Sequence, residues 1–423
     1  MQISHAQPHL ERGLQYWEGV EATVNGVLGG YGLGTLPVVD SLGTRTFILN
    51  LLAHLVLTPP ATVADPAAWL KERAAARAKL RSTESGGLGP LGRTRALDVG
   101  AGVGRVSRDT LLPLVEEVHL VEPVRKFLDE AKKTSASWSE LSYTDPDSAT
   151  QTAKKSKGKK NEESGRKEFR DLIRASHGRK LAYFWENTMQ DFDPSFPRSR
   201  SGASPIPPTL SPEESAIAEF KTSLETQANE SETSTNDGPL TRQQTKRRRT
   251  GSGSGPSLSI RAPARKSLDG VSMELSHISA DLGLQLDSQA VKYDVILIQW
   301  CAQHLKDTEM VAFLHRCQKA LKSRVEMLGE PGTALNPPIL ENDQKALADP
   351  GLGGGIVVIK ENVCTEDEDG NERVVWDDED HSITRSRKAY ERLFKEAGME
   401  IVKSEVQLGL PAELFEVRQW ALR

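Results

Sequence analysis

The chain has 423 residues and a net charge of −5, from 54 lysine and arginine residues against 59 aspartate and glutamate residues. This balance gives no overall attraction to polyanions, which argues against nucleic acid as a partner. Hydrophobic residues make up only 37% and aromatic residues only 5% of the chain, so we expect part of it to lie outside any packed core.

The cysteines and the apolar runs indicate the cellular compartment. Cys301, Cys317 and Cys364 are the only cysteines and do not have metal-ligand spacing, so we expect no metal site and a reducing environment. The N-terminus lacks an apolar signal core, and the longest apolar run, Phe47–Leu57, is too short to span a bilayer. We therefore expect a soluble cytoplasmic protein without a membrane partner, with the nucleus left open as a second compartment. A monomer is expected.

The first part of the chain is helical in pattern. Residues 13–57 are amphipathic and broken by a glycine-rich turn, which indicates either a mobile cap carrying Trp17 and Tyr31 or a helical hairpin packed on the domain. We assign 1–57 to an N-terminal helical cap, with a strong helix over 44–57. Residues 58–93 form a helical linker.

From residue 94 onward, apolar strands alternate with helical segments, which predicts a mostly parallel sheet flanked by helices. Strands are expected at 95–99, 117–121, 181–185, 293–300, 355–360, 399–406 and 414–422, the last two forming a hairpin. Helices are expected at 104–115, 123–133, 307–322 and 383–397. Between them, a hairpin within 362–378 would turn at Asp369-Gly370-Asn371.

Three polar segments interrupt this domain of 94–423. Residues 134–178, 194–290 and 324–353 have too few apolar side chains to offset their chain entropy, so we expect disordered insertions. The second contains KRRR at 246–249, which is typical of a nuclear import signal or an RNA-contacting patch but is also common in simply solvated chain.

The clearest motif, ALDVGAGVGR, lies between the first strand and the first helix of the domain. Glycines at 100, 102 and 104 let backbone N–H groups approach a ligand, and Glu122 follows at the end of the next strand, where a carboxylate usually binds ribose hydroxyls. NAD, FAD and S-adenosylmethionine (SAM) sites all use such a turn. Asp98, just before the first glycine, favours SAM.

Other polar and aromatic residues follow the later strands, at the same edge of the predicted sheet. Gln299-Trp300 and His304 follow one strand, Asn362 ends the next, and the acidic run Trp376–Asp380 comes after it. A carboxylate or imidazole is a sufficient base for an α-amino group, whose pKa is about 7.7–8.0. The histidine could equally be a cap or core residue, and the acidic run a solvated turn.

Several of these motifs together resemble the α-N-terminal protein methyltransferases, which methylate the free α-amine of proteins beginning X-Pro-Lys or X-Pro-Arg after initiator Met removal. The resemblance covers 13–50, 95–133, 181–192 and 293–423, but not the three insertions. It is carried by Tyr16-Trp17, Gly26-x-Leu28-Gly29-Gly30-Tyr31-Gly32, LDVGAGVGR, Ile298-Gln299-Trp300-x-x-x-His304-Leu305, Ile359-Lys360-Glu361-Asn362, Asp377-Asp378-x-Asp380-x-Ser382 and the terminal Ala421-Leu422-Arg423.

The resemblance implies a Rossmann-like class I SAM methyltransferase fold, with the cap over a substrate channel, and a role for each matching residue. Asp380 and His304 would be the catalytic residues, acting together as general bases toward the α-amine. The implied cofactor-binding residues are Gly100, Gly102, Arg105, Glu122, Met189, Gln190 and Gln299. The implied substrate-binding residues are Trp17, Leu28, Tyr31, Trp300, Asn362, Asp377 and Ser382. Phe415 departs from the tyrosine common in the family, which puts any hydroxyl contact there in doubt.

Two other interpretations stay open on the residues alone. One is a SAM-dependent methyltransferase acting on a small molecule or RNA, although the acidic run argues against a phosphate backbone. The other is a binding protein that has kept the fold without the activity, although the complete glycine motif and the carboxylates argue against it.

Overall fold

The computed structural model describes most of the chain outside the three expected insertions. The described residues are 7–56, 63–82, 93–138, 141, 180–200, 290–328 and 354–423. All of them belong to one unit, which comprises Met1–Thr209 and Leu286–Arg423.

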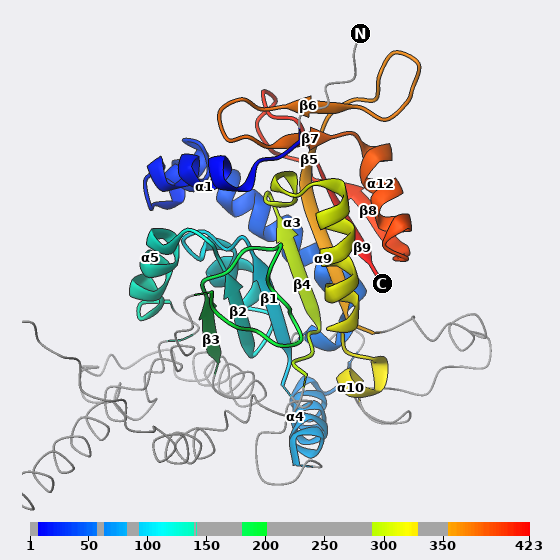
Figure 1. Cartoon of the computed structure of the whole chain (residues 1–423). Coiled ribbons are helices and arrows are strands. Elements are labelled where there is room, and N and C mark those ends of the chain that lie inside the picture. The colour runs from blue at the N-terminus through cyan, green and yellow to red at the C-terminus, as the bar shows by residue number, and fades with distance from the viewer. Residues whose placement is uncertain are drawn as a thin grey trace, which may run out of the picture. The chain divides into compact units, whose positions relative to one another are not determined.

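A seven-stranded sheet organises this unit (Figure 1). The strand order is β3-β2-β1-β4-β5-β9-β8. The first five strands in this order are parallel, and β9 is antiparallel to both of its neighbours. The bounds are β1 Arg95–Val99, β2 Glu117–Val121, β3 Leu181–Trp185, β4 Val295–Gln299, β5 Ile356–Val363, β8 Ile401–Val406 and β9 Glu416–Leu422. This confirms the predicted mostly parallel, Rossmann-like sheet and its terminal hairpin.

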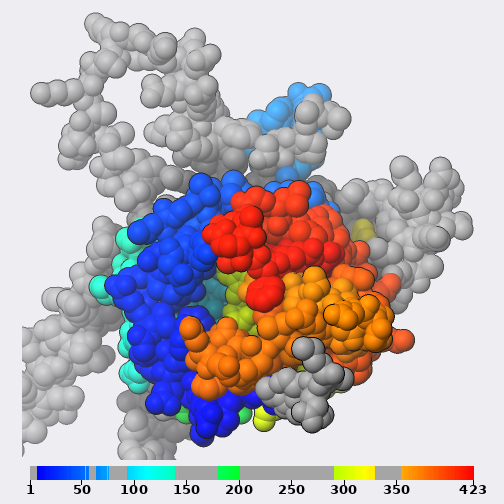
Figure 2. Space-filling model, turned by 90° about the horizontal axis from the view of Figure 1, so that it is seen from above, coloured from blue at the N-terminus to red at the C-terminus, as the bar shows by residue number. Residues whose placement is uncertain are grey.

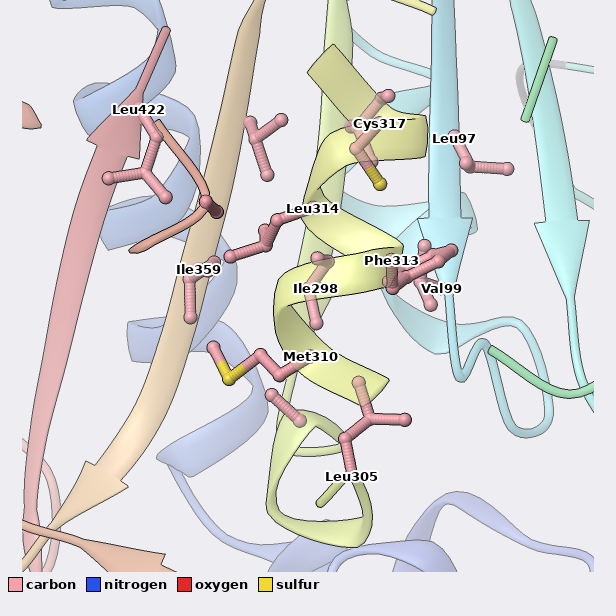
Figure 3. Packing of buried hydrophobic residues seen from close by; sticks show 14 of the residues in the cluster. Leu97, Val99, Ile298, Leu305, Met310, Phe313, Leu314, Cys317, Ile359 and Leu422 are labelled. Carbon is pink, nitrogen blue, oxygen red and sulfur yellow. The ribbon is translucent and has the colours of Figure 1, made fainter. Parts of the chain in front are cut away.

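Every residue of β1, β2 and β4 is buried. Because alternate residues of a strand point to opposite sides, both faces of the sheet are therefore covered. Helix α9 (Asp307–Lys319) covers one face, where its Met310, Phe313, Leu314 and Cys317 pack on side chains from β1, β4, β5 and β9 (Figure 3). Helix α3 (Leu36–Leu51) contributes Phe47 and Ile48 to the other face. The parallel strands therefore end together at one edge of a well-packed core.

The N-terminal segment consists of short helices around the glycine-rich turn. Helices α1 (Leu10–Gly19) and α2 (Val24–Val27) precede the turn η1 (Tyr31–Leu33) and then α3. The predicted helix over 44–57 was placed too late, since α3 begins at Leu36 with a proline in its first turn and ends at Leu51. The turn η2 (Ala53–Leu55) follows, and α4 (Pro66–Ser82) lies in the expected linker.

The hairpin predicted within 362–378 is wrong in its pairing. Strand β6 (Val374–Trp376) pairs with β7 (Ile383–Arg385), and Cys364 instead forms a parallel bridge with Ser386. The predicted helix from residue 383 therefore begins late, as α12 (Arg387–Glu396), because its first residues are taken up by β7. It ends, as predicted, before Gly398, whose φ is +67°.

The expected insertions are also narrower where the structure describes their ends. Helix α5 (Arg125–Ser135) runs past residue 134, and Trp138 is buried. Residues 194–200 are hydrogen-bonded back to the core, and α10 (Arg324–Leu328) occupies the start of the third insertion. The rest of each insertion, including the KRRR run, lies outside the described residues.

Candidate active site

The loop after β1 is shaped by its glycines. Gly100, Gly102 and Gly104 have φ values of +65°, +54° and +79°, in the region that disfavours other residues. Space adds a second constraint, because a Cβ on Gly100 would lie 2.7 Å from the Cβ of Cys301. The helix predicted over 104–115 is shorter than expected, with a π-helical turn at η3 (Ser107–Leu111). Such turns are frequent at functional sites.

Two buried carboxylates support this loop. Glu122, directly after β2, accepts hydrogen bonds from the N–H groups of Gly102 and Val124, each at 2.8 Å. Asp98 accepts a 2.6 Å bond from the Ser107 hydroxyl. Burial raises the pKa of Glu122 to about 7 and that of Asp98 to about 6. The glycine loop is thus fixed from the side where the sequence predicted a ribose-binding carboxylate.

A second loop, after β3, closes another side of the site. Met189 and Gln190 lie on it, and their carbonyl groups accept hydrogen bonds from the guanidinium of Arg316 at 2.7 and 3.0 Å. Arg316 also donates to the carbonyl of Phe192 at 3.0 Å. No sequence signal marks Arg316, since it lies on helix α9 and belongs to no motif.

The turn after β4 holds Trp300 in an unusual conformation. Its φ is +53°, one of two positive values at non-glycine residues in the described part of the chain. The next two N–H groups, of Cys301 and Ala302, both donate to Glu361 Oε1 of the neighbouring strand, at 2.8 and 2.7 Å. Glu361 is completely buried, which raises its pKa to about 8. It therefore anchors the turn that carries Trp300 and His304.

His304 and Asp380 lie beside each other, as the resemblance implied. His304 Nε2 is 3.8 Å from Asp380 Oδ2, too far for a direct hydrogen bond, and it accepts a 3.2 Å bond from the indole N–H of Trp17. That bond requires the proton of a neutral imidazole to be on Nδ1. Burial lowers the pKa of His304, against the opposing charges of Asp380 and Asp377. Helix α1 approaches this pair at Gly13, where a Cβ would lie 3.2 Å from the Asp380 carbonyl oxygen.

The connection between β6 and β7 positions Asp380. Asp377 and Ser382 close it through a 3.0 Å backbone hydrogen bond from the Asp377 N–H to the Ser382 carbonyl. Asp380 Oδ1 accepts from the Ser382 N–H at 3.1 Å, and His381 takes a φ of +55°. Asp377 is exposed and Ser382 is buried. The acidic run is therefore an ordered turn with one carboxylate directed at His304.

Asp40 is the main feature of the site that the sequence analysis missed. This aspartate of α3 is fully buried and contacts three residues: Arg105 after the glycine loop, Gln299 at the end of β4, and Lys360 within β5. A single acid in the apolar run PVVDSLG carries no sequence signal for such contacts.

One cavity brings most of the predicted site residues together at the carboxyl ends of the strands. Seen from that end, the surface is hollowed between the N-terminal segment (blue) and the C-terminal strands (orange and red) (Figure 2). All seven predicted cofactor residues line the cavity: Gly100, Gly102, Arg105, Glu122, Met189, Gln190 and Gln299. Trp17, Leu28, Trp300 and His304 line it as well.

The other predicted residues are not in the described lining but lie on neighbouring elements. Asp380 Oδ2 lies 3.8 Å from Nε2 of His304, which lines the cavity. Tyr31 donates a 3.3 Å hydrogen bond to Glu413, and Asn362 pairs with Val417 in the sheet. Asp377 and Ser382 lie on the acidic turn. The described lining of the cavity therefore does not include the side chains of these last four residues.

The lining fits the chemical groups of SAM. Arg105 offers a guanidinium to a carboxylate, and Gln299 has a buried Oε1 without a hydrogen-bond partner among the described residues. Glu122 offers carboxylate lone pairs beside the glycine loop. In the part of the chain that the structure describes, no helix combines the length and apolar character needed to cross a bilayer.

Comparison with known proteins agrees with this geometry. The model of the family described as AdoMet-dependent proline di-methyltransferase matches residues 5–64, 76–150, 278–329 and 343–423, more than half of the chain. An alpha N-terminal protein methyltransferase 1 of Arabidopsis thaliana is 23% identical over 97% of this chain and 78% of its own length. The protein of the same name from Schizosaccharomyces pombe is 22% identical over 97% of this chain and 93% of its own length.

A relative named for its substrate matches a shorter stretch. The N-terminal Xaa-Pro-Lys N-methyltransferase 1 of Danio rerio is 32% identical over 33% of this chain and 48% of its own length. The family match, the sheet and the cavity lining lead to one conclusion. The chain belongs to the AdoMet-dependent proline di-methyltransferase family and is a SAM-dependent protein N-terminal methyltransferase.

Proposed function

We propose that this enzyme methylates the free α-amine of proteins that begin X-Pro-Lys or X-Pro-Arg. One observation carries the proposal: the cavity that holds the glycine loop also contains His304, which lies beside Asp380, and two tryptophans, Trp17 and Trp300. An imidazole with a carboxylate beside it, both able to accept a proton from an amine, therefore lies at the same cavity as the predicted cofactor-binding residues.

In this proposal the methionine part of SAM lies against Gly100, Gly102 and Arg105, and Gln299 lies beside it. Glu122 takes the ribose hydroxyls, and the loop of Met189 and Gln190 flanks the adenine. These residues converge on one cavity from different loops. When bound, the cofactor supplies an electrophilic methyl group on a sulfonium; binding, orientation and proton removal fall to the side chains of the chain.

The α-amine must lose a proton before its lone pair can attack. Its pKa of about 7.7–8.0 is low enough for a carboxylate or imidazole to accept that proton near neutral pH. Asp380 Oδ2 can accept an amine proton through a hydrogen bond of about 2.8–3.0 Å, and His304 Nε2 lies 3.8 Å from that oxygen. Burial lowers the pKa of His304 and keeps its imidazole neutral, and Nε2 can accept the amine proton once the Trp17 indole N–H releases its hydrogen bond to that nitrogen.

The walls of the cavity favour an N-terminus with proline second. Proline has no N–H and a fixed φ, so it suits a slot between aromatic side chains, where an unpaired N–H would be costly. Trp17 and Trp300 line the cavity and offer such faces. Asp377, an exposed carboxylate of the 377–380 turn, and Ser382 would meet a basic third residue.

Mass spectrometry with short peptides tests the substrate directly. The enzyme and SAM are incubated with a peptide that begins Ser-Pro-Lys, with its Ser-Ala-Lys counterpart, and with an N-acetylated Ser-Pro-Lys peptide. We expect added CH₂ groups on the first peptide alone. Methylation of the acetylated peptide would place the reaction on the lysine side chain and contradict the proposal; methylation of neither proline peptide would contradict it as well.

The variant Asp380→Asn tests the proposed base. It keeps the size of the side chain and its acceptor oxygen for the Ser382 N–H, but it removes the negative charge. We expect kcat on the Ser-Pro-Lys peptide to fall about a hundredfold or more, with SAM affinity within about twofold of the wild type. Asp378→Asn, on the exposed part of the same turn, is the matched control and should keep its rate. An equal loss of SAM affinity in Asp380→Asn would show that the carboxylate supports the cavity instead.

A further inference from the structure

Asp40 lies behind the cavity wall and contacts two residues that line it. Asp40 belongs to α3 and is fully buried. Its Oδ2 accepts a 2.7 Å hydrogen bond from the guanidinium of Arg105. Both of its carboxylate oxygens accept from the Gln299 Nε2 group, at 3.0 and 2.9 Å. Lys360 Nζ lies 2.5 Å from Oδ1. These four residues are called the Asp40 cluster below.

The Asp40 cluster contains one negative charge and two positive charges. Burial alone would raise the pKa of Asp40, but the charges of Lys360 and Arg105 hold it below its ordinary value, so the carboxylate is ionised. Lys360 also donates to the Thr44 hydroxyl and to Gln407 Oε1, both at 2.9 Å, and does not belong to the described lining of the cavity. The excess positive charge is therefore presented to the cavity by Arg105.

Asp40 also fixes the orientation of the Gln299 amide. An ionised carboxylate can only accept hydrogen bonds, so the amide must turn its Nε2 group toward Asp40. Gln299 Oε1 is then on the other side of the amide, where it is buried and has no hydrogen-bond partner among the described residues. Because Gln299 lines the cavity, this orientation gives the cavity a buried acceptor next to a guanidinium donor.

A donor and an acceptor in this arrangement match the two charged groups of an α-amino acid. We propose that Asp40 is a positioning residue that orients Arg105 toward the carboxylate and Gln299 Oε1 toward the ammonium group of the methionine part of SAM. The inference rests on the proposed placement of SAM in this cavity. It also makes α3, part of the segment predicted as a cap over the substrate, a structural component of the cofactor site.

Calorimetric binding of two ligands to Asp40→Asn tests the inference. S-adenosylhomocysteine contains the amino-acid moiety; 5′-methylthioadenosine has the same adenine, ribose and thioether but lacks it. The amide that this substitution introduces can donate to Gln299 Oε1, which allows the Gln299 amide to reverse, and it no longer balances the charge of Arg105. We expect the affinity for S-adenosylhomocysteine to fall about tenfold or more, with 5′-methylthioadenosine affinity within about twofold of the wild type.

A matched control is Asp294→Asn. Asp294 is fully buried and pairs with Lys322 at 2.7 Å and with His54 at 3.0 Å. It directly precedes the first residue of β4, whereas Gln299 is the last residue of that strand. This variant loses a comparable buried charge, and both ligands should bind as in the wild type. If Asp40→Asn does not fold, the double variant Asp40→Leu/Lys360→Met removes the acid and a cation together and should show the same selective loss.

The outcomes separate the inference from the proposal beneath it. If Asp40→Asn lowers the affinity for both ligands equally, or leaves the affinity for S-adenosylhomocysteine unchanged, the proposed role of Asp40 is overturned. A wild-type enzyme that binds S-adenosylhomocysteine no more tightly than 5′-methylthioadenosine would instead overturn the placement of the amino-acid moiety at Arg105 and Gln299.

Discussion

Glu361 shows how one buried side chain fixes the geometry of the candidate active site. Trp300 takes a φ of +53°, a conformation that costs of order 1–3 kcal/mol and persists only where neighbouring contacts enforce it. The enforcing contacts are the hydrogen bonds from Cys301 and Ala302 to Glu361 Oε1. Glu361 Oε2 is buried without a hydrogen-bond partner among the described residues. The orientation of Trp300 therefore depends on an acid that is itself unfavourable to bury.

Burial of that acid predicts a pH-dependent stability. The pKa of Glu361 is about 8 in the folded protein against 4.5 for an ordinary glutamate, so the folded state binds more protons between these pH values and stability falls as pH rises. Glu361→Gln keeps the accepting oxygen but cannot ionise. We expect its Tm relative to the wild type to rise by roughly 5 °C between pH 5 and pH 8. Parallel Tm curves for the two proteins would contradict the buried, proton-binding carboxyl.

The residues of the site differ in how far the sequence could predict them. The glycine loop and Glu122 have a fixed spacing around one strand–helix turn, so they could be located without a structure. Asp40 could not, because its partners Arg105 and Lys360 are 65 and 320 residues away and the pattern around it is only apolar. The roles that resemblance gives to the site residues stay predictions, those of Tyr31, Asn362, Asp377 and Ser382 included.

Among the elements, α9 links the core to the loop after β3, which carries Met189 and Gln190. Its apolar residues pack on the sheet, while Arg316 donates three hydrogen bonds to the carbonyl groups of Met189, Gln190 and Phe192. These carbonyls belong to a loop with little regular structure of its own. The position of that loop therefore depends on a helix that does not itself belong to the described lining of the cavity.

Removing the Arg316 side chain tests this dependence. Arg316→Ala leaves three loop carbonyls without their donor, at a cost of about 1–3 kcal/mol. We expect the dissociation constants of SAM and 5′-methylthioadenosine both to rise about tenfold, because in the proposed placement the loop flanks the adenine that the two ligands share. The rate at saturating SAM should stay within about twofold of the wild type. Lys319→Ala, on an exposed position of the same helix, should bind both ligands as the wild type does; unchanged binding in Arg316→Ala would show that the loop holds its position alone.

At the same scale, the β6–β7 hairpin shows where sequence patterns mislead. Asp369-Gly370-Asn371 has the residues of a hairpin turn, yet the strand at Val374 pairs with the chain after it. The true connection, 377–382, contains no glycine or proline. It is stabilised by hydrogen bonds to the Asp377 and Asp380 carboxylates and places His381 at a φ of +55°. The same hydrogen bonds direct Asp380 at His304. They therefore determine both the shape of this turn and the position of the candidate base.

For the whole molecule, the candidate active site is built from parts of the chain far apart in sequence. The cavity lining runs from Leu10 in α1 to His304 after β4, with Asp380 behind it. Residues 201–289 lie outside the described part of the chain. The chain on either side of them is joined by a 2.8 Å hydrogen bond from the Val291 N–H to the Ser195 carbonyl. Before the insertion, the Arg200 N–H donates to the Glu186 carbonyl at 2.8 Å.

This arrangement predicts that the second insertion can be replaced. Because Ser195 and Val291 are hydrogen-bonded neighbours, a short Gly-Ser linker in place of 202–289 can reconnect the chain, and a shorter loop costs less closure entropy. We expect kcat/KM on the Ser-Pro-Lys peptide within about twofold of the wild type and a Tm that is unchanged or slightly higher. A Gly-Ser replacement of the original length separates the effect of sequence from that of length. A shortened protein that keeps its Tm and SAM affinity but loses peptide methylation would show that this insertion takes part in substrate recognition. The cavity at the carboxyl ends of the strands would then be only part of the site.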